Sequence, residues 1–217
     1  PMIQHVYERA AKATTLQRLV VATDDQRIER AVAKFGGEVL MTSRDHPSGT
    51  DRVAEASRQL MLQEDAIVVN IQGDEPLVQA AMIDSLTQIL QQNIDVPMAT
   101  LAYPDTDRND LFDPDVVKVV IDSKGRALYF SRSPIPNLRD ESSPPPYYKH
   151  LGFYAYRNGF LQDFTKLSPG VLEKLEKLEQ LRALEHGFSI SVVIAPSDSI
   201  SVDTAEDLAR VRKIMEQ

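Results

Sequence analysis

The sequence contains no cysteine among its 217 residues. Disulfide bonds and thiolate chemistry are therefore excluded, and the composition suits a reducing compartment. The sequence also has no apolar run long enough to span a bilayer, and nothing in it resembles a secretion signal. We therefore expect a cytoplasmic, soluble protein with no membrane partner.

Basic residues are also scarce: 24 Lys and Arg stand against 32 Asp and Glu, for a net charge of −8. A general nucleic-acid surface needs a basic stripe that displaces counterions, so we expect no nucleic-acid partner. A nucleotide substrate is still allowed, because a few local basic groups and a divalent cation can hold a triphosphate. No Walker-type glycine loop and no Ser/His/Asp or Cys/His nucleophile set stands out.

Apolar runs alternate with helical stretches along the first half of the chain. The runs at 19–23, 38–42, 66–71 and 97–103 predict strands, and the first of these should be buried on both faces. Helical spacing predicts helices near 28–35, 51–63 and 80–92. This order predicts an α/β fold, with a mostly parallel, Rossmann-like sheet between two helical layers.

The second half of the chain differs. Residues 116–121 and 127–130 flank a turn-rich segment and predict a β-hairpin. The Pro- and Ser-rich stretch 137–147 is either a mobile connection or a plain surface loop. A strand at 150–156, a helix at 171–186, a strand at 190–194 and a closing helix from 203 follow. We predict one domain, 1–217, with a hairpin arm inserted at about 104–156.

Two aspartates are candidate metal ligands. Asp74 follows the strand at 66–71, at the sheet edge where ligands gather. It offers an oxygen ligand of the kind that Mg²⁺ binds, or it bonds only its own turn. Asp203 is either the N-cap of the last helix or a second carboxylate brought to Asp74, and the local pattern does not decide between them.

Other polar residues are weaker candidates. Ser48–Thr50 allows close approach to a base or a phosphate, or simply starts a helix. Arg52 suits a bidentate contact with a carboxylate or a phosphate. His150 and Tyr154 should share one face of a strand, where they bind sugar hydroxyls or are half-buried sheet residues. Glu179, at the edge of an apolar stripe, is either salt-bridged or hydroxyl-binding.

Taken in order, these segments resemble the 3-deoxy-manno-octulosonate cytidylyltransferase family. The matching segments are 19–23, 41–52, 69–76, 129–132, 150–154, 178–182 and 202–208, which together cover essentially the whole chain. The resemblance implies a nucleotide-diphospho-sugar transferase-like fold. It also implies that CTP reacts with 3-deoxy-manno-octulosonate (Kdo) to give CMP-Kdo and pyrophosphate, which serves lipopolysaccharide assembly.

The resemblance further assigns roles to single residues. Asp74 and Asp203 would be the catalytic Mg²⁺ ligands, and the nucleotide would lie near Ser48, Gly49 and Gln72. The sugar side would be lined by seven residues: Arg52, Lys118, Arg132, His150, Tyr154, Glu179 and Gln180. A homodimer is also implied, with the hairpin as a candidate contact.

Members of this family begin with a strand and an Arg- and Lys-bearing loop that wraps the triphosphate. Pro1–Ile3 resembles the element just after that loop, so we expect such a segment to precede Pro1 in the encoded protein. A chain that began at Pro1 should bind CTP poorly. Two alternatives remain open: a cytidylyltransferase for a related acidic sugar, such as amino-Kdo or a sialic acid, and a non-catalytic nucleotide- or sugar-binding module.

Overall fold

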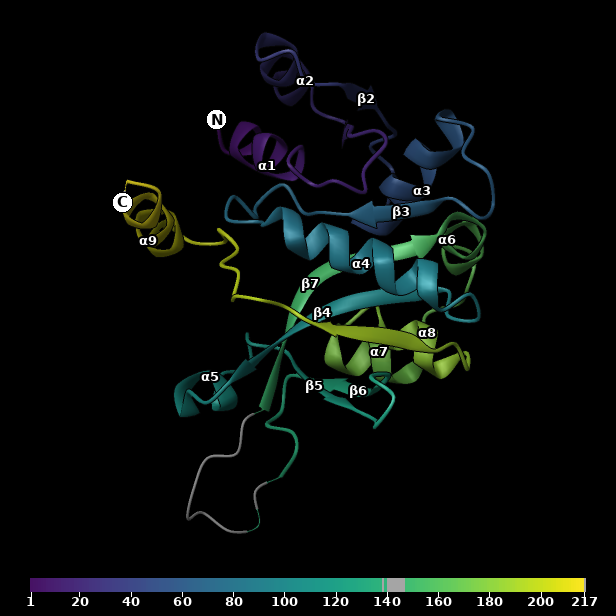
Figure 1. The fold of residues 1–217 in the computed structure, drawn as a ribbon, viewed down its shortest axis with the longest axis vertical. Helices are drawn as coiled ribbons and strands as arrows, with labels where there is room; N and C mark the ends of the chain where they lie inside the picture. Colours follow the sequence, from purple (N-terminus) through teal and green to yellow (C-terminus); the bar gives the residue numbers. More distant parts are fainter. Residues whose placement is uncertain (138, 140–146, 217) are drawn as a thin grey trace.

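The computed structural model describes residues 1–137, 139 and 147–216. Within this part of the chain, a six-stranded sheet has the order β6-β5-β7-β4-β8, and β3 pairs with β7 (Figure 1). The six strands are β3 (Ile67–Asn70), β4 (Met98–Asp105), β5 (Lys118–Ile121), β6 (Ala127–Ser131), β7 (Tyr147–Arg157) and β8 (Ile190–Ile194).

Most strands of this sheet run in one direction. β4 and β8 are parallel, whereas β7 is antiparallel to β3, β4 and β5. It follows that β3, β4, β5 and β8 point the same way, and that β7 and β6 point the other way. The predicted α/β class and mostly parallel sheet are confirmed. The reversed strand in the middle was not predicted, because nothing local in its sequence specifies the direction of its partners.

Two apolar cores lie on opposite faces of the sheet and make the fold three-layered. On one face, α1 (Met2–Ala10) and α4 (Ala80–Gln92) cover the sheet, and Met82, Ile83, Leu86 and Leu90 of α4 are fully buried. The other core contains residues of α3 (Gly49–Gln59), α6 (Asn158–Phe164) and α8 (Leu181–Glu185). Each core is formed by the apolar stripe of its helices and the strand residues beneath.

The first strands form a separate unit. β1 (Val21–Thr23) and β2 (Val39–Met41) pair in parallel as a two-stranded sheet. Among the described residues β1 has no strand partner besides β2. Val21 and Ala22 are half-buried and Thr23 is buried, so the predicted burial of this strand on both faces is found only in part. The helix α2 (Gln26–Lys34) starts after Asp25, whose side chain accepts from the amide of Arg27, and Gly36 follows its C-cap in the left-handed conformation (φ +77°).

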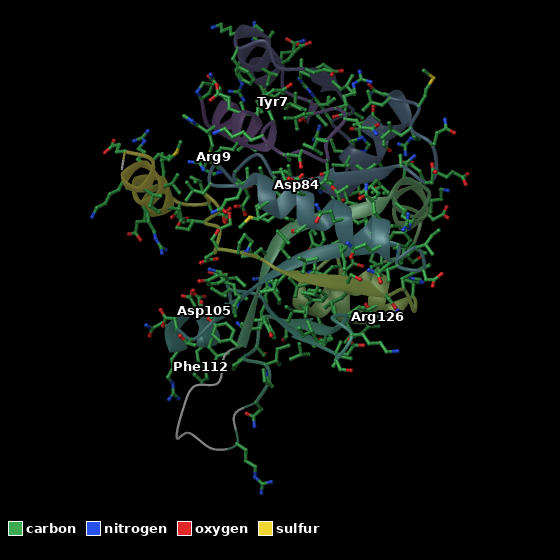
Figure 2. All side chains as sticks on the ribbon, viewed as in Figure 1. Tyr7, Arg9, Asp84, Asp105, Phe112 and Arg126 are labelled. Carbon is green, nitrogen blue, oxygen red and sulfur yellow. The ribbon has the colours of Figure 1, made fainter. Side chains whose placement is uncertain are left out.

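Side chains of α1 and α4 are among those that connect this unit to the rest of the molecule. The carboxylate of Asp84 on α4 accepts from the amides and hydroxyls of both Thr14 and Thr15. The hydroxyl of Tyr7 on α1 donates to the carbonyl of Leu19 (3.4 Å) and accepts from the amide of Glu38 (3.2 Å). Figure 2 shows Tyr7 on α1, with Asp84 on the neighbouring α4.

The helix predicted at 171–186 is two short helices, α7 (Val171–Glu176) and α8. Lys177 breaks it by adopting the left-handed conformation (φ 56°, ψ 44°). The carboxylate of Glu185 then accepts from the amides of Leu172 and Glu173 at the start of α7, so α8 folds back on α7. As a result, Glu179 and Gln180 lie in the turn between the helices.

β5 and β6 form the predicted hairpin, with Gly125 at φ +75° in its turn, and β5 continues the main sheet through β7. The stretch predicted as a connection at 137–147 lies largely outside the described residues. The remaining helices are α5 (Arg108–Phe112) and α9 (Ala205–Met215). In the part of the chain that the structure describes, no helix is long and apolar enough to cross a membrane. The division into one domain with an inserted arm stays a prediction.

Candidate functional site

Along one edge of β7, the two partner strands β3 and β5 are separated by a gap, and the candidate site lies at this gap. Residues 154–157 of β7 pair with β3, and residues 148–149 pair with β5. Between these stretches, Gly152 and Phe153 have no register partner on β4 either, because the pairing shifts there. The chain leaving the end of β3 enters this gap, where Nε2 of Gln72 donates to the carbonyl of Gly152 (3.2 Å). A Cβ at position 152 would lie 2.9 Å from this amide nitrogen, so glycine permits the contact.

Asp74 lies just beyond that contact and is half-buried. Its Oδ1 atom is buried and has no hydrogen-bond partner among the described residues. Burial and, to a smaller extent, the negative charge of Asp203 raise the pKa of Asp74 above its ordinary value. A buried carboxylate oxygen without a donor is unfavourable, and a cation bound there would stabilise its charged form.

Asp203 reaches this place on the connection from β8 to α9. The amide of Val202 donates to the carbonyl of Asp74 (2.9 Å), which brings the next residue beside the first acid. The cap of α9 is Thr204, whose hydroxyl accepts from the amide of Asp207 and whose amide donates to the Asp207 carboxylate. The alternative that Asp203 is the N-cap is therefore wrong, and its exposed carboxylate accepts instead from the Ser201 hydroxyl (2.9 Å).

These two acids suit a hard cation with few protein ligands. Among the described residues, no group of three or more His, Cys, Asp or Glu side chains could hold a metal ion. Magnesium commonly binds through one or two carboxylates and takes its other ligands from water and phosphate oxygens. The orphaned Oδ1 of Asp74 and the nearby Asp203 therefore fit Mg²⁺.

Glu75, the next residue, was not singled out from the sequence. It is only 7% exposed, and its Oε2 accepts a hydrogen bond from the hydroxyl of Ser199 (2.5 Å). Burial raises the pKa of Glu75 to about 7, while the hydrogen bond from Ser199 acts in the opposite direction. The local sequence does not indicate that this acid is buried. Its burial comes from the connection between β8 and α9, which carries Ser199 across the turn.

On the predicted nucleotide side, Ser48 is the N-cap of α3. Its hydroxyl accepts from the amide of Asp51 (3.2 Å) and donates to the carboxylate of the same residue (2.7 Å). A Cβ at the exposed Gly49 would meet nothing within 4 Å. The helix-start interpretation of this segment is confirmed. Open space over Gly49 is compatible with a ligand, and the nucleotide contacts of Ser48, Gly49 and Gln72 stay predictions.

Arg52 ties together the ends of β1 and β2. Its guanidinium donates to the hydroxyl of Thr42 (2.6 Å) and pairs with the carboxylate of Asp24 (3.1 Å). A carboxylate or phosphate of a substrate would have to compete with Asp24 for this group. The predicted sugar contact of Arg52 stays a prediction.

His150 and Tyr154 lie together, with ring centroids 5.5 Å apart, as their spacing predicted. Nε2 of His150 is 2.9 Å from the hydroxyl of Thr100, and the Phe130 ring meets the imidazole edge-on. Burial lowers the pKa of His150 to about 3 and raises that of Tyr154 well above its ordinary value. Both side chains are therefore neutral at pH 7 and can exchange hydrogen bonds with hydroxyl groups.

Glu179 and Gln180 approach from the turn between α7 and α8. Oε2 of Glu179 accepts from the hydroxyl of Thr50, and Oε1 lies 3.6 Å from the Arg182 guanidinium. Gln180 is 4% exposed, and its Nε2 has no hydrogen-bond partner among the described residues. Two of the residues singled out from the sequence, Asp74 and Gln180, thus carry buried polar atoms that the described protein leaves unsatisfied.

Lys118 and Arg132 hold loops together on the hairpin side. The fully buried Lys118 donates from Nζ to the carbonyls of Asp113, Val116 and Arg132, which takes all three of its N–H groups. Arg132 donates from its guanidinium to the carbonyls of Glu176 and Pro114. This geometry gives Lys118 no remaining donor for a sugar. The sugar contacts of both residues stay predictions.

The sequence has clear relatives among characterised families. Residues 1–193 match the model of a family described as cytidylyltransferase. The chain is 59% identical to a 3-deoxy-manno-octulosonate cytidylyltransferase of Syntrophobacter fumaroxidans, across 100% of this chain and 87% of the relative. It is also 52% identical to an 8-amino-3,8-dideoxy-manno-octulosonate cytidylyltransferase of Shewanella sediminis, across 96% of this chain and 85% of the relative.

A solved structure of a CMP:2-keto-3-deoxy-manno-octonic acid synthetase in complex with CTP is also similar. The two structures superpose with a TM-score of 0.93 at 42% identity, over 100% of this chain and 88% of the other. This agreement over the whole length confirms the predicted fold.

Proposed function

Since this chain belongs to the 3-deoxy-manno-octulosonate cytidylyltransferase family, we propose that it transfers CMP from CTP to the anomeric hydroxyl of Kdo. The hydroxyl oxygen attacks the α-phosphorus, the bond from that phosphorus to the bridging oxygen breaks, and pyrophosphate leaves. The hydroxyl proton passes to solvent. The structural observation that carries the proposal is the orphaned Oδ1 of Asp74, with Asp203 beside it, at the end of β3.

The chain's own residues mainly position the reactants. We assign Asp74 and Asp203 to hold Mg²⁺, which when bound would orient the phosphates and offset the charge that develops on pyrophosphate. Neutral His150 and Tyr154, and the unsatisfied amide of Gln180, offer hydrogen bonds to sugar hydroxyls. No covalent intermediate on the protein is needed, which agrees with the lack of an evident nucleophile set.

Kdo is the proposed sugar, and its 8-amino analogue is the second candidate because relatives of about the same similarity carry that name. The Shewanella sediminis relative is 52% identical, and a 3-deoxy-manno-octulosonate cytidylyltransferase of Pseudomonas fluorescens is also 52% identical. Turnover with Kdo, 8-amino-3,8-dideoxy-manno-octulosonate and a sialic acid, compared at equal concentration, distinguishes them. Product from the amino sugar or the sialic acid alone would overturn the assignment to Kdo.

The test of the activity is pyrophosphate release by the full encoded protein. We expect release only when CTP, Kdo and Mg²⁺ are all present, and loss of release when a chelator removes the metal. CTP binding without release under any of these conditions would support a non-catalytic binding module instead.

We also propose a cytoplasmic homodimer that serves lipopolysaccharide assembly. The hairpin is the proposed contact, supported by the apolar Leu128 on β6, which is 61% exposed. Light scattering on the purified protein should give the mass of two chains. A Leu128→Asp variant should shift that mass toward one chain, and an unchanged mass would remove the hairpin from the interface.

A further inference from the structure

The connection between β8 and α9 carries Asp203 across the end of β3. Residues 195–204 have no helix or strand, so side-chain and backbone contacts fix their path. Two of these contacts reach the turn after β3: the amide of Val202 donates to the carbonyl of Asp74 (2.9 Å), and the hydroxyl of Ser199 donates to Glu75 (2.5 Å).

The contact between Glu75 and Ser199 is shielded from solvent, since the two residues are 7% and 6% exposed. Other bonds of the connection are more exposed, such as the one from Nε2 of Gln79 to the Ser197 hydroxyl (2.7 Å). A buried hydrogen bond whose partner is removed leaves an unsatisfied polar group, so it restricts the path of the chain more than an exposed one does. Ser199 lies four residues before Asp203.

We propose that Glu75 is a positioning residue: by accepting the Ser199 hydroxyl, it holds the connection so that the Asp203 carboxylate faces Asp74. This inference rests on the proposed function, in which Asp74 and Asp203 hold the cation. Glu75 itself acts through Ser199 and does not bind the cation.

If Glu75 were a metal ligand, its variants should behave differently from those of a positioning residue. The side-chain carbonyl of glutamine can accept the Ser199 hydroxyl, but it is a poorer replacement for a carboxylate that coordinates Mg²⁺. Glu75→Gln should therefore behave like the parent protein, and Glu75→Ala should not. Ser199→Ala should reproduce the defect of Glu75→Ala, because it removes the same bond from the other side.

The experiment compares these variants with the parent full-length protein in two measurements. The first is the Mg²⁺ concentration that gives half-maximal pyrophosphate release. We expect this Mg²⁺ concentration to rise about tenfold in Ser199→Ala and in Glu75→Ala. The double variant should show the same rise of about tenfold as each single variant, and Glu75→Gln should show little change. The second is hydrogen–deuterium exchange of the metal-free protein, in which the amides around Val202 should exchange faster in the two alanine variants.

Ser197→Ala is the matched control, because it makes the same substitution on the same connection and should change neither measurement. Unchanged values in Ser199→Ala would overturn the inference. Equal defects in Glu75→Gln and Glu75→Ala, with normal exchange at Val202, would overturn it in favour of a ligand role. Asp203→Asn separates the two proposals: if it keeps the parent's turnover and Mg²⁺ requirement, the proposed cation site itself fails.

Discussion

Thr50 donates a hydrogen bond from its buried hydroxyl to Oε2 of Glu179, 2.5 Å away, and so joins the first turn of α3 to the turn between α7 and α8. The two residues are 129 positions apart in the sequence. This bond connects the segment assigned to the nucleotide with the segment assigned to the sugar.

Replacing Thr50 with valine keeps the volume and removes the hydroxyl. We expect the variant to lose about 1–3 kcal/mol of stability and to show a raised KM for Kdo, because Glu179 loses its donor. Urea denaturation and steady-state kinetics measure the two effects. Thr87→Val is the matched control, since among the described residues this buried hydroxyl bonds only the Ile83 carbonyl of its own helix. A raised KM in the control as well would show that the effect is not specific to Glu179.

Asp74→Asn and Asp203→Asn should each reduce turnover to near zero while leaving the protein folded. The buried Asp74 carboxylate is already unfavourable beside Asp203, so we expect Asp74→Asn to keep or raise the melting temperature. Asp207→Asn provides the comparison on the same segment: it weakens the cap of α9 and should cost about 1 kcal/mol of stability with little loss of turnover. Near-normal turnover in Asp203→Asn would exclude this residue as a required cation ligand.

Lys118→Met should destabilise the protein by roughly 3 kcal/mol or more, because three carbonyls lose a charged donor in a buried place. Lys124→Met, in the exposed turn of the hairpin, should change the free energy of unfolding by less than about 0.5 kcal/mol. Urea titrations measure both. A Lys118→Met variant that kept its stability but lost Kdo binding would favour the sugar contact implied by the family resemblance.

His150 should make the protein less stable in acid. Burial holds its folded-state pKa near 3, below the unfolded value of 6.5, so the unfolded chain binds a proton first as the pH falls. The stability that this group contributes is complete above pH 6.5 and is lost as the pH falls toward 3. Between pH 7 and pH 4.5 we expect a loss of about 2 kcal/mol that is absent in His150→Gln. An equal loss in both proteins would assign the acid sensitivity to other groups.

The spacing of apolar residues correctly predicted the helices and strands that have a strong apolar periodicity. The helix at 80–92 and the strand at 66–71 agree with α4 and β3 because their apolar periodicity is strong. The break at Lys177 was missed, because nothing local specifies a left-handed lysine, and the Glu185 carboxylate that binds the start of α7 lies beyond the break. The spacing of apolar residues does not indicate such a contact between two helices.

In the candidate site too, some residues were predicted from the local sequence and others depend on contacts between distant segments. Asp74 was found because it follows a strong strand, but pattern alone did not separate a ligand from a cap at Asp203. The observed cap at Thr204 excludes the cap alternative, and the ligand role of Asp203 stays a prediction. Glu75 was passed over because its burial depends on Ser199, which is 124 residues away in the sequence. Gln180 was selected only through the family resemblance, and its unsatisfied amide is a property of the folded chain.

β7 carries both halves of the site on one continuous backbone. The end of β3, which leads to the acids, pairs with β7 from Tyr154 onward, and the start of β5 pairs with it at Lys149. The separation between the phosphate side and the hairpin side is therefore set by a stretch of one strand, at most about 16 Å at the usual rise per residue. A deletion of Gly152 would shorten that length and reverse the facing of every residue on one side of it, so the distance from the acids to the hairpin depends on this stretch of β7.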